Sequence, residues 1–539
     1  MLRVSHTSSL PLLFGLLALA ACATPTTPTT PTTTPTTTPT TTPTTTPATR
    51  VGKTGELHIV FTADEHGWLL PFKDKSAGVF RGGVHAAAAT MKAEGYSKGA
   101  PGWLLLSAGD MWTGPYESTV LEGAPMAAAM KHLGYSGAAV GNHEFDFGTR
   151  VLAERQKGAG FPFLAANILD VARNAPPAWA KPYTIVDVPL EGGTSLKVGV
   201  VGLGCFESPV TADVRHMVGL SFEPYRQSLA QWLPEVEKEG VDAIVVVAHD
   251  ALSVLEPLAP FLRSHKVIAV AGGHEHRAGI FVDDLGNDDV KDDIVFCNGG
   301  PYLRSFCRVD LTLKDGALVA HGQKIVNVER PLDVPVVPFD DGLKAITDNA
   351  EESATRIGGE VLVENKQKLG RGREGALGQL VVDAWLDALP YAQVAITNSG
   401  GLRQDIEAGP LRLRDVVSAL PFNNYLLVVD MTGAELKEVL NNPDTVAGGV
   451  TWKFREEHGG TRVVTQVVDK TGKPIADAAQ LKVIINDFMF RGGDKYRFND
   501  KEPEETAVDW REPIFRFLRD LKQKGGVLDR AAEQRARTE

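Results

Sequence analysis

Five short apolar runs, each with Asp, Asn or His just past its C-terminal end, most constrain what this chain can fold into. They are residues 57–63 before Asp64-Glu65-His66, 103–108 before Gly109-Asp110, 138–140 before Gly141-Asn142-His143-Glu144, 243–248 before His249-Asp250, and 267–271 before Gly272-Gly273-His274-Glu275-His276. Each run is typical of a buried strand, and helical patterns lie between the runs, which predicts α/β layers. Ligands of open α/β sheets bind beyond the carboxyl ends of the strands, so we expect these polar side chains to form a site.

The residue types at these strand ends indicate metal chemistry. Imidazoles and carboxylates without cysteine suit Zn, Mn, Fe or Co better than Ca. The set is too large for one tetrahedral site and sufficient for two ions, with Asp110 as the best bridging carboxylate. Two metals about 3.5–4 Å apart are a common device for in-line attack on phosphorus. The candidate ligands are Asp64, His66, Asp110, Asn142, His249, His274 and His276.

Taken together, these motifs resemble the calcineurin-like metallophosphoesterase signature and, more narrowly, the 5′-nucleotidase/UDP-sugar hydrolase family. The resemblance runs from about residue 55 to 520. It implies a mixed α/β fold, with an N-terminal four-layer α/β/β/α sandwich and a separate C-terminal α/β nucleotide-binding domain. Two segments depart from the usual family pattern, but no ligand is lost. Ala63 stands before Asp64 where the family often has Asn, and Ala248-His249-Asp250-Ala251 stands where it often has Ser-His-Leu-Gly.

The resemblance also implies residue roles. One divalent ion (Zn, Mn, Co or Fe) would be held by Asp64, His66, Asp110 and His276, and a second by Asp110, Asn142, His249 and His274. His143 and Asp146 match the catalytic pair of the family. His143 would stabilise the phosphoryl oxygens in the transition state, and Asp146 would orient and charge its ring.

The C-terminal part contains glycine-rich clusters at residues 370–374, 398–403 and 488–494. Arginines beside glycine turns suit anion recognition, and two aromatic rings can sandwich a base. Surface ion pairs and core phenylalanines are the alternative explanation. The resemblance favours substrate binding by Arg371, Asn398, Arg403, Phe422, Phe488 and Asp494, with the two phenylalanines stacking on the base and Asp494 binding the ribose.

The first fifty residues are predicted to be a targeting segment and not part of the folded domains. Residues 1–21 have the pattern of a lipoprotein signal peptide, because an apolar stretch ends in Leu19-Ala20-Ala21-Cys22, which resembles a bacterial lipobox with Cys22 as the acylated residue. An ordinary signal peptide that happens to contain a cysteine is the alternative. Residues 22–50 form a Thr/Pro-rich tether, in which proline prevents helix. We therefore expect export and a lipid anchor in a bacterial membrane, either the outer membrane facing the periplasm or the cell surface.

The remaining boundaries follow from the same patterns. We predict a metallophosphoesterase domain over 51–338, a bridging helix or hinge over 339–358, and a substrate-binding domain over 359–530.

Apart from Cys22, the cysteines are Cys205, Cys297 and Cys307, an odd number. Cys297 and Cys307 flank a Gly-Gly-Pro turn, and both a disulfide and buried free thiols remain open.

The function is predicted from the metal-binding motifs of the N-terminal part together with the substrate residues of the C-terminal part. Acidic residues exceed basic ones, 67 against 55, which argues against a nucleic-acid polymer as partner. We expect a lipid-anchored phosphohydrolase acting on nucleoside 5′-monophosphates, with UDP-sugars or nucleoside di- and triphosphates as further substrates. A 2′,3′-cyclic-nucleotide phosphodiesterase with 3′-nucleotidase activity, or a thiosulfohydrolase-like relative, is the second hypothesis. The third, a non-catalytic surface protein, fits poorly with a full set of metal and catalytic residues.

Overall fold

The computed structural model describes residues 53–538, except 75–76, 288, 316, 336 and 458–461. The predicted signal peptide, the lipidation site Cys22 and the Thr/Pro-rich tether lie outside the described residues. Within the described part of the chain, no helix combines the length and the apolar character needed to cross a membrane.

The N-terminal half is built around two six-stranded mixed sheets. The first has the order β16 (Ala317–Asn327), β15 (Ser305–Lys314), β1 (Gly55–Thr62), β4 (Trp103–Ser107), β5 (Gly137–Ala139) and β6 (Phe163–Leu164). The second has the order β13 (Gly279–Asp283), β14 (Ile294–Asn298), β12 (Val267–Gly272), β11 (Ala243–Ala248), β9 (Ser195–Leu203) and β8 (Tyr183–Pro189). The five strands predicted from the apolar runs are confirmed as β1, β4, β5, β11 and β12.

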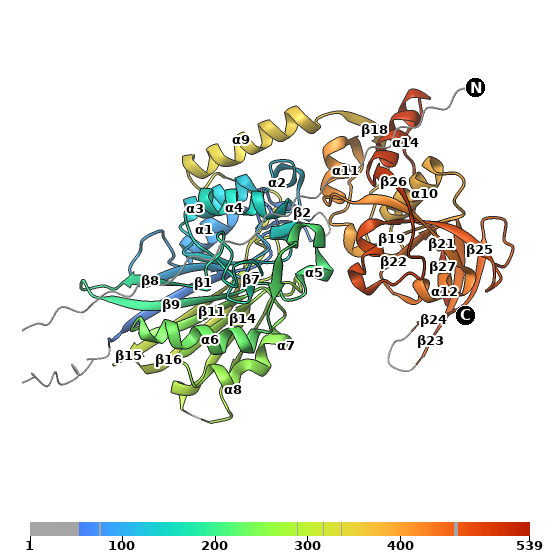
Figure 1. Cartoon of the computed structure of the whole chain (residues 1–539). Coiled ribbons are helices and arrows are strands. Elements are labelled where there is room, and N and C mark those ends of the chain that lie inside the picture. The colour runs from blue at the N-terminus through green and yellow to red at the C-terminus, as the bar shows by residue number, and fades with distance from the viewer. Residues whose placement is uncertain are drawn as a thin grey trace, which may run out of the picture. The chain divides into compact units, whose positions relative to one another are not determined.

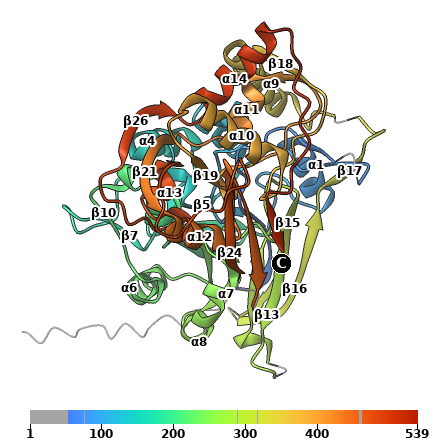
Figure 2. The same ribbon diagram turned by 90° about the vertical axis from the view of Figure 1, so that its right-hand side faces the viewer.

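Helices cover the outer face of each sheet, so the half has four layers (Figure 1). The first sheet packs against α1 (Val84–Ala93), α3 (Ala124–Leu133) and α4 (Gly148–Ala159), and the second against α6 (Tyr225–Lys238), α7 (Leu252–Leu255) and α8 (Ala259–Leu262). In the turned view, α6, α7 and α8 again lie on the side away from α1 and α4 (Figure 2). Between the sheets is a third core that includes Phe61, Leu106 and Val245. Strands covered on both faces read as continuous apolar runs, which explains the sequence pattern.

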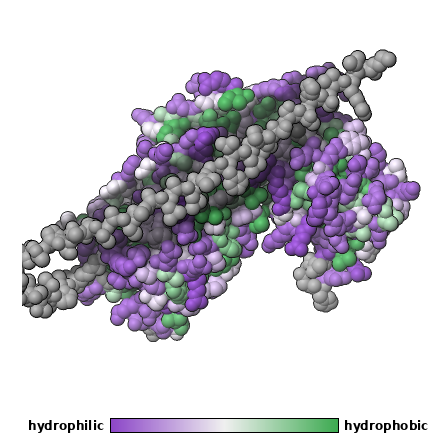
Figure 3. All heavy atoms as spheres, in the orientation of Figure 1, coloured by the Kyte–Doolittle hydropathy of each residue, from purple (hydrophilic) through white to green (hydrophobic). Residues whose placement is uncertain are grey.

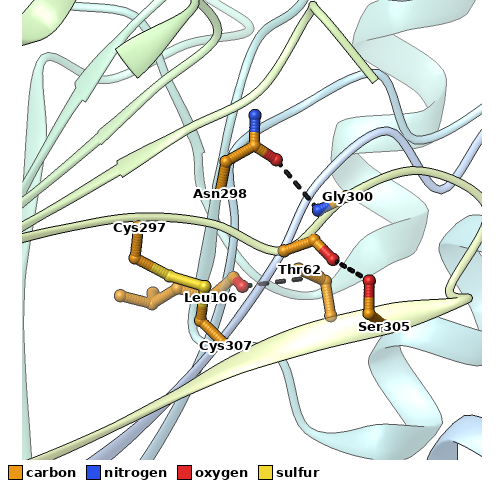
Figure 4. The surroundings of a disulfide bond; sticks show 8 residues. Thr62, Leu106, Cys297, Asn298, Gly300, Ser305 and Cys307 are labelled. Carbon is orange, nitrogen blue, oxygen red and sulfur yellow. Dashed lines mark hydrogen bonds between the residues drawn. A yellow bond between two sulfur atoms is a disulfide. The ribbon is translucent and has the colours of Figure 1, made fainter. Parts of the chain in front are cut away.

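A disulfide joins the two sheets through this inner core (Figure 4). Cys297 lies in β14 of the second sheet and Cys307 in β15 of the first, and both side chains are fully buried. The ten-residue separation encloses the loop between these strands. Cys205 is a buried free thiol. Of the two possibilities left open by the sequence, the structure therefore has the disulfide.

Breaking this disulfide should destabilise the sandwich. Closing a loop of this length removes entropy from the unfolded chain, which corresponds to about 2–4 kcal/mol. We expect a reducing agent to lower the midpoint of urea unfolding of the wild-type protein, whereas a Cys297→Ala/Cys307→Ala variant should unfold early with or without reductant. Equal midpoints for oxidised and reduced wild-type protein would contradict the assignment.

The C-terminal half begins after α9 (Asp341–Gly358), the helix predicted between the two halves. Its five-stranded sheet has the order β22 (Thr445–Gly448), β19 (Val394–Asn398), β25 (Gln480–Asn486), β21 (Tyr425–Thr432) and β26 (Glu504–Asp509). Helices α10 (Ala376–Ala388) and α14 (Glu512–Gln523) share one core with this sheet, and α12 (Gly433–Asn441) shares another. The second core also includes residues of β23 (Val450–Glu456), which pairs with β24 (Arg462–Asp469) and β27 (Ala536–Thr538).

The exterior is mainly hydrophilic in the view of Figure 3, with apolar side chains in scattered groups. Phe206, Val210, Val214 and Val218 are among the exposed apolar residues, with between 42 and 86% of each residue accessible. They belong to the segment that contains α5 (Ser208–Thr211) and precedes α6. This segment contributes one wall of the cavity described next.

Candidate active site

The strand ends of both sheets converge on one group of side chains that could hold metal ions. Two sets of residues each place a ligand atom within 4.8 Å of all the others in the set. The first set is Asp64, His66, Asp110 and His276, and the second is Asp110, His249 and His274. Asp110 belongs to both sets, which is the position predicted for a bridging carboxylate.

Short distances between these side chains show how tightly they converge. The Nε2 atoms of His66 and His276 are 2.9 Å apart, and Nε2 of His249 lies 3.1 Å from Oδ2 of Asp110. Asn142, the remaining predicted ligand, places its Oδ1 atom 3.1 Å from Nδ1 of His274. All seven predicted ligands therefore lie in one group.

Left-handed backbone places most of the ligands. Asp64, His66, Asp110, His274 and His276 all have φ between 45° and 72°. Such a conformation costs a residue other than glycine about 1–3 kcal/mol and persists where the surroundings impose it. At neighbouring Gly141, a Cβ atom would lie 2.1 Å from Oδ1 of Asp110, so only glycine fits. The turns after the strands are thus shaped around the ligands.

Hydrogen bonds at the far side of each ring orient the histidines. Nδ1 of His66 donates to the carbonyl of Thr113 at 2.8 Å, and Nδ1 of His249 donates to the carbonyl of Ala108 at 2.9 Å. Nδ1 of His276 lies 3.3 Å from the hydroxyl of Tyr302. A carbonyl can only accept, so it fixes a proton on Nδ1 and directs Nε2 of His66 and His249 toward the metal group. Without a metal ion, burial opposes the charged form of His249, but Asp110 and Asp64 beside it raise its pKa to about 10.

Burial controls the charges in the group. It lowers the pKa of His66 and His276 well below the ordinary value and that of His274 to about 4, so these rings are neutral at pH 7. Burial would raise the pKa of Asp110, but His249 and His143 beside it bring that pKa well below its usual range. For Asp64, burial dominates and raises the pKa to about 7.

These properties fit divalent metal ions. Neutral imidazoles and carboxylates are the ligands that Zn, Mn, Fe and Co accept. Oδ2 of Asp64 is buried without a hydrogen-bond partner among the described residues. Buried polar atoms are normally paired, so this carboxylate oxygen beside the imidazoles indicates a place for a cation.

Glu144 clamps the turns that carry the ligands. Its buried carboxylate accepts hydrogen bonds from the backbone amides of Asp110 at 2.9 Å, Met111 at 2.8 Å and Gly141 at 2.6 Å. The amide of His143 donates in turn to Oδ1 of Asp110 at 2.9 Å. Glu144 therefore joins the turn after β4 to the turn after β5 and fixes the backbone of the bridging residue.

Glu144→Gln should destabilise the protein and loosen the metal group. The amide nitrogen of glutamine would face a backbone N–H in place of an accepting oxygen, and an unsatisfied buried donor costs about 1–3 kcal/mol. We expect a corresponding loss in the free energy of unfolding, measured with urea, and weaker metal retention during dialysis. Glu154→Gln, at an exposed position on α4, is the matched control. Equal stability of the two variants would refute the clamp.

The predicted catalytic pair is assembled beside the ligands. Nδ1 of His143 lies 2.8 Å from Oδ2 of Asp146. Burial opposes the charged ring, but Asp146 and Asp110 raise the pKa of His143 above its ordinary value. A histidine N–H donor held by a carboxylate beside these side chains is suited to stabilise negative charge on phosphoryl oxygens.

Most of the predicted substrate residues line one cavity of about 590 Å³ that also reaches the ligands. Asn398, Arg403, Phe422, Phe488 and Asp494 border it together with His143 and Asp146. Nδ2 of Asn398 donates to Asp494 at 2.7 Å. The ring of Phe422 stacks on His143 at 5.2 Å between centroids. Arg371 does not line this cavity but a neighbouring one, where its Nη1 donates to the carbonyl of Arg403 at 2.8 Å.

Sequence reasoning did not identify two contributors. Glu144 is the last residue of the Gly-Asn-His-Glu motif, so its position next to His143 is evident from the sequence. The motif does not reveal that the Glu144 carboxylate accepts hydrogen bonds from backbone amides. Tyr302 carries no sequence signal. The loop enclosed by the disulfide brings it to His276, and its amide donates to the carbonyl of Asp64 at 2.8 Å.

Two family models match the chain. Residues 57–278 match the calcineurin-like phosphoesterase model, and residues 355–500 match the C-terminal domain of 5′-nucleotidase. The first match contains the seven candidate ligands, and the second contains the six candidate substrate residues.

Whole-chain comparisons agree with these matches. The 5′-nucleotidase of Vibrio cholerae is 27% identical over 434 residues, which cover 72% of this chain and 76% of the relative. The 5′-nucleotidase of Bos taurus is 26% identical over 82% of this chain and 84% of its own length. The crystal structure of a 5′-nucleotidase precursor from Thermus thermophilus has the same fold, with a TM-score of 0.74, 24% identity and coverage of 90% of this chain and 99% of that one. The chain belongs to the 5′-nucleotidase family and is a metal-dependent phosphoester hydrolase.

Proposed function

We propose that this protein is a lipid-anchored, extracytoplasmic 5′-nucleotidase that uses two divalent ions to convert nucleoside 5′-monophosphates into nucleoside and phosphate. The observation that carries the proposal is the single cavity that joins the metal ligands and His143 to Phe422, Phe488 and Asn398. Acids and imidazoles that would hold metal ions, with a histidine donor beside them, suit a phosphate, and aromatic rings and amides suit a nucleoside.

On the phosphate side, the ligand residues would hold the ions, which supply Lewis acidity and activation of water when bound. His143 would donate a hydrogen bond to a phosphoryl oxygen, and Asp146 would hold the proton on Nδ1 so that Nε2 faces the substrate. Arg403 would add a second cationic donor, because its Nη2 lies 3.4 Å from Nε2 of His66. Arg371 would support Arg403 through the carbonyl contact.

On the nucleoside side, Phe422 and Phe488 would stack on the base and Asp494 would accept hydrogen bonds from the ribose hydroxyls. Because Phe422 stacks on His143 here, a base entering between the two phenylalanines requires its ring to move. We propose that the domains are 51–338 and 359–530 and that the bridge over 339–358 contains the hinge for this movement. A disulfide engineered to hold the halves apart tests it, since unchanged turnover would refute an essential closure.

Export and anchoring complete the proposal. Cys22 would be acylated after removal of residues 1–21, and the tether over 22–50 would hold the enzyme away from a bacterial membrane. Metabolic labelling with a radioactive fatty acid should label the wild-type protein and not a Cys22→Ala variant.

The first test is phosphate release by protein beginning near Val51. It is assayed metal-free and with Mn²⁺, Zn²⁺ or Co²⁺ against AMP, ATP, UDP-glucose, 2′,3′-cyclic AMP and 3′-AMP. Metal-dependent release from AMP supports the proposal, and release from ATP or UDP-glucose shows how wide the substrate range is. Preference for the cyclic or 3′ substrates would replace it with the phosphodiesterase hypothesis. No release from any of them with metal bound would refute it.

A further inference from the structure

Asp250 is a buried acid to which the proposed reaction gives no role. It follows the candidate ligand His249 directly, at a position where the family often has leucine. Only 7% of the residue is exposed. Its Oδ1 accepts a hydrogen bond from the amide of Ala251 at 2.8 Å, and its Oδ2 accepts one from the hydroxyl of Tyr225 at 2.8 Å. Both partners are donors, so the position requires two accepting oxygens, and leucine could make neither contact.

Tyr225 extends this contact to a second segment of the chain. It is the first residue of α6, and it is buried. Its hydroxyl donates to Asp250 and accepts a hydrogen bond from the backbone amide of Phe206 at 3.0 Å. The Phe206 ring also packs edge-on against the Tyr225 ring, with 6.2 Å between the centroids. The turn after β11 is thereby joined to the segment that follows β9.

The segment that starts at Phe206 continues into the single hydrogen-bonded turn of α5. The carbonyl of Glu207 accepts the backbone amides of Val210 at 2.9 Å and Thr211 at 3.0 Å. It also accepts the hydroxyl of Thr211 at 2.9 Å. Val210 and Thr211 border the cavity at the metal ligands. Because these bonds hold the turn together, a displacement of Phe206 would move Thr211 as well.

Thr211 in turn contacts a candidate metal ligand. Its carbonyl accepts a hydrogen bond from Nδ2 of Asn142 at 3.4 Å. Oδ1 of Asn142 points to the other side, 3.1 Å from Nδ1 of His274 in the ligand group. A carboxamide has an oxygen on one side and an N–H donor on the other, and only the oxygen has lone pairs for a metal ion. The Thr211 carbonyl therefore favours the orientation in which Oδ1 faces the ligand group.

We propose that Asp250 and Tyr225 are positioning residues for the second metal ion. Through the amide of Phe206 they hold residues 206–211 in place, and the carbonyl at the end of this segment orients Asn142 as a ligand. Neither Asp250 nor Tyr225 borders the substrate cavity, so they act through the segment alone. Groups behind a metal ligand commonly change metal affinity by about 10–100-fold. This inference rests on the two-ion site of the proposed function.

Tyr225→Phe tests this series of contacts, because it removes the hydroxyl and keeps the ring. The full-length protein is stripped of metal and titrated with Mn²⁺ by calorimetry, which needs no turnover. Asn142→Ala identifies the binding step that depends on Asn142. Tyr225→Phe should weaken the same step by at least about fivefold and leave the other step within about twofold. Asp250→Asn should act alike, because one of the two donors would lose its accepting oxygen.

A double variant separates positioning from general stability. Once Asn142 is replaced, the segment has no ligand left to orient. Adding Tyr225→Phe to Asn142→Ala should therefore cause less than about twofold further loss of Mn²⁺ affinity. A purely structural role would weaken both binding steps and would persist in the double variant, and either result would overturn the inference. Tyr183→Phe is the matched control and should bind Mn²⁺ like the wild type, because Tyr183 packs on Trp232 of the same helix and does not border the cavity.

Failure of this inference can be distinguished from failure of the proposed function. If the wild type hydrolyses AMP and Tyr225→Phe binds both ions as the wild type does, the positioning role is refuted and the nucleotidase stands. If the wild type binds two ions but releases no phosphate from AMP, the nucleotidase fails, and the Mn²⁺ affinities alone decide the positioning role. A wild type that binds only one ion would overturn the inference together with the two-ion site.

Discussion

Asp110→Asn should abolish stable binding of the metal pair and reduce kcat/KM by at least about 10³-fold. Asp110 is the residue common to both candidate ligand sets, so the change would remove a negative charge that two bound ions would share. Losing several kcal/mol of metal-dependent stabilisation of the transition state corresponds to a rate loss of about this size. Metal content per protein, measured by mass spectrometry after dialysis, and phosphate release from AMP together check the prediction.

Asparagine is the appropriate replacement because it tolerates the left-handed backbone found at Asp110, with φ of 58°. The fold should survive, and the far-ultraviolet circular dichroism spectrum should be unchanged. Asp187→Asn, at an exposed position on β8, is the control and should keep two ions and full activity. A variant at position 110 that retains two ions and wild-type activity would exclude Asp110 as the shared ligand.

His143→Ala should lower kcat by about 10²–10³-fold without changing metal content, because one donor to the developing charge is lost. His143 is not in either ligand set, although it lies beside both. Asp146→Asn should give a smaller loss, because the ring remains and only its orientation and charge suffer. Steady-state kinetics with AMP and metal analysis of the same samples separate the two effects.

The control for this series is His321→Ala, a ring that contacts Asp293 from strand β16. It should retain wild-type kinetics. If His143→Ala lost metal in proportion to activity, the residue would be structural for the metal group, and its assignment as a transition-state donor would be wrong.

The strands, and the positions of the candidate ligands after them, were predictable from the sequence for one physical reason. A strand buried on both faces is largely apolar, so its end can be recognised by the polar residues and glycines that follow, and the candidate ligands are among these residues. β11 is the clearest example, since the predicted run over 243–248 and the strand Ala243–Ala248 coincide. The same reasoning applies to Asp64 and Asp110, which lie a short distance after the ends of β1 and β4.

Contacts between distant segments were not predictable. The pairing of Cys297 with Cys307 depends on β14 and β15 facing each other from different sheets, and the sequence left two outcomes open. Nothing in the sequence distinguishes Arg304 from other charged residues, and its contacts with Trp68 and Phe72 appear only in the structure. The stacking of Phe422 on His143 likewise joins segments 279 positions apart, for which periodicity gives no signal.

The left-handed ligand turns have a consequence for how such an enzyme can diversify. A turn closed around a residue with positive φ has a fixed length, so inserting or deleting one residue would rotate the ligand away from its partners. Length variation during evolution should therefore be excluded from the segments after β1, β4 and β12. The loops that only border the cavities are free of this restriction. New substrate ranges should arise there, while the chemistry stays in place.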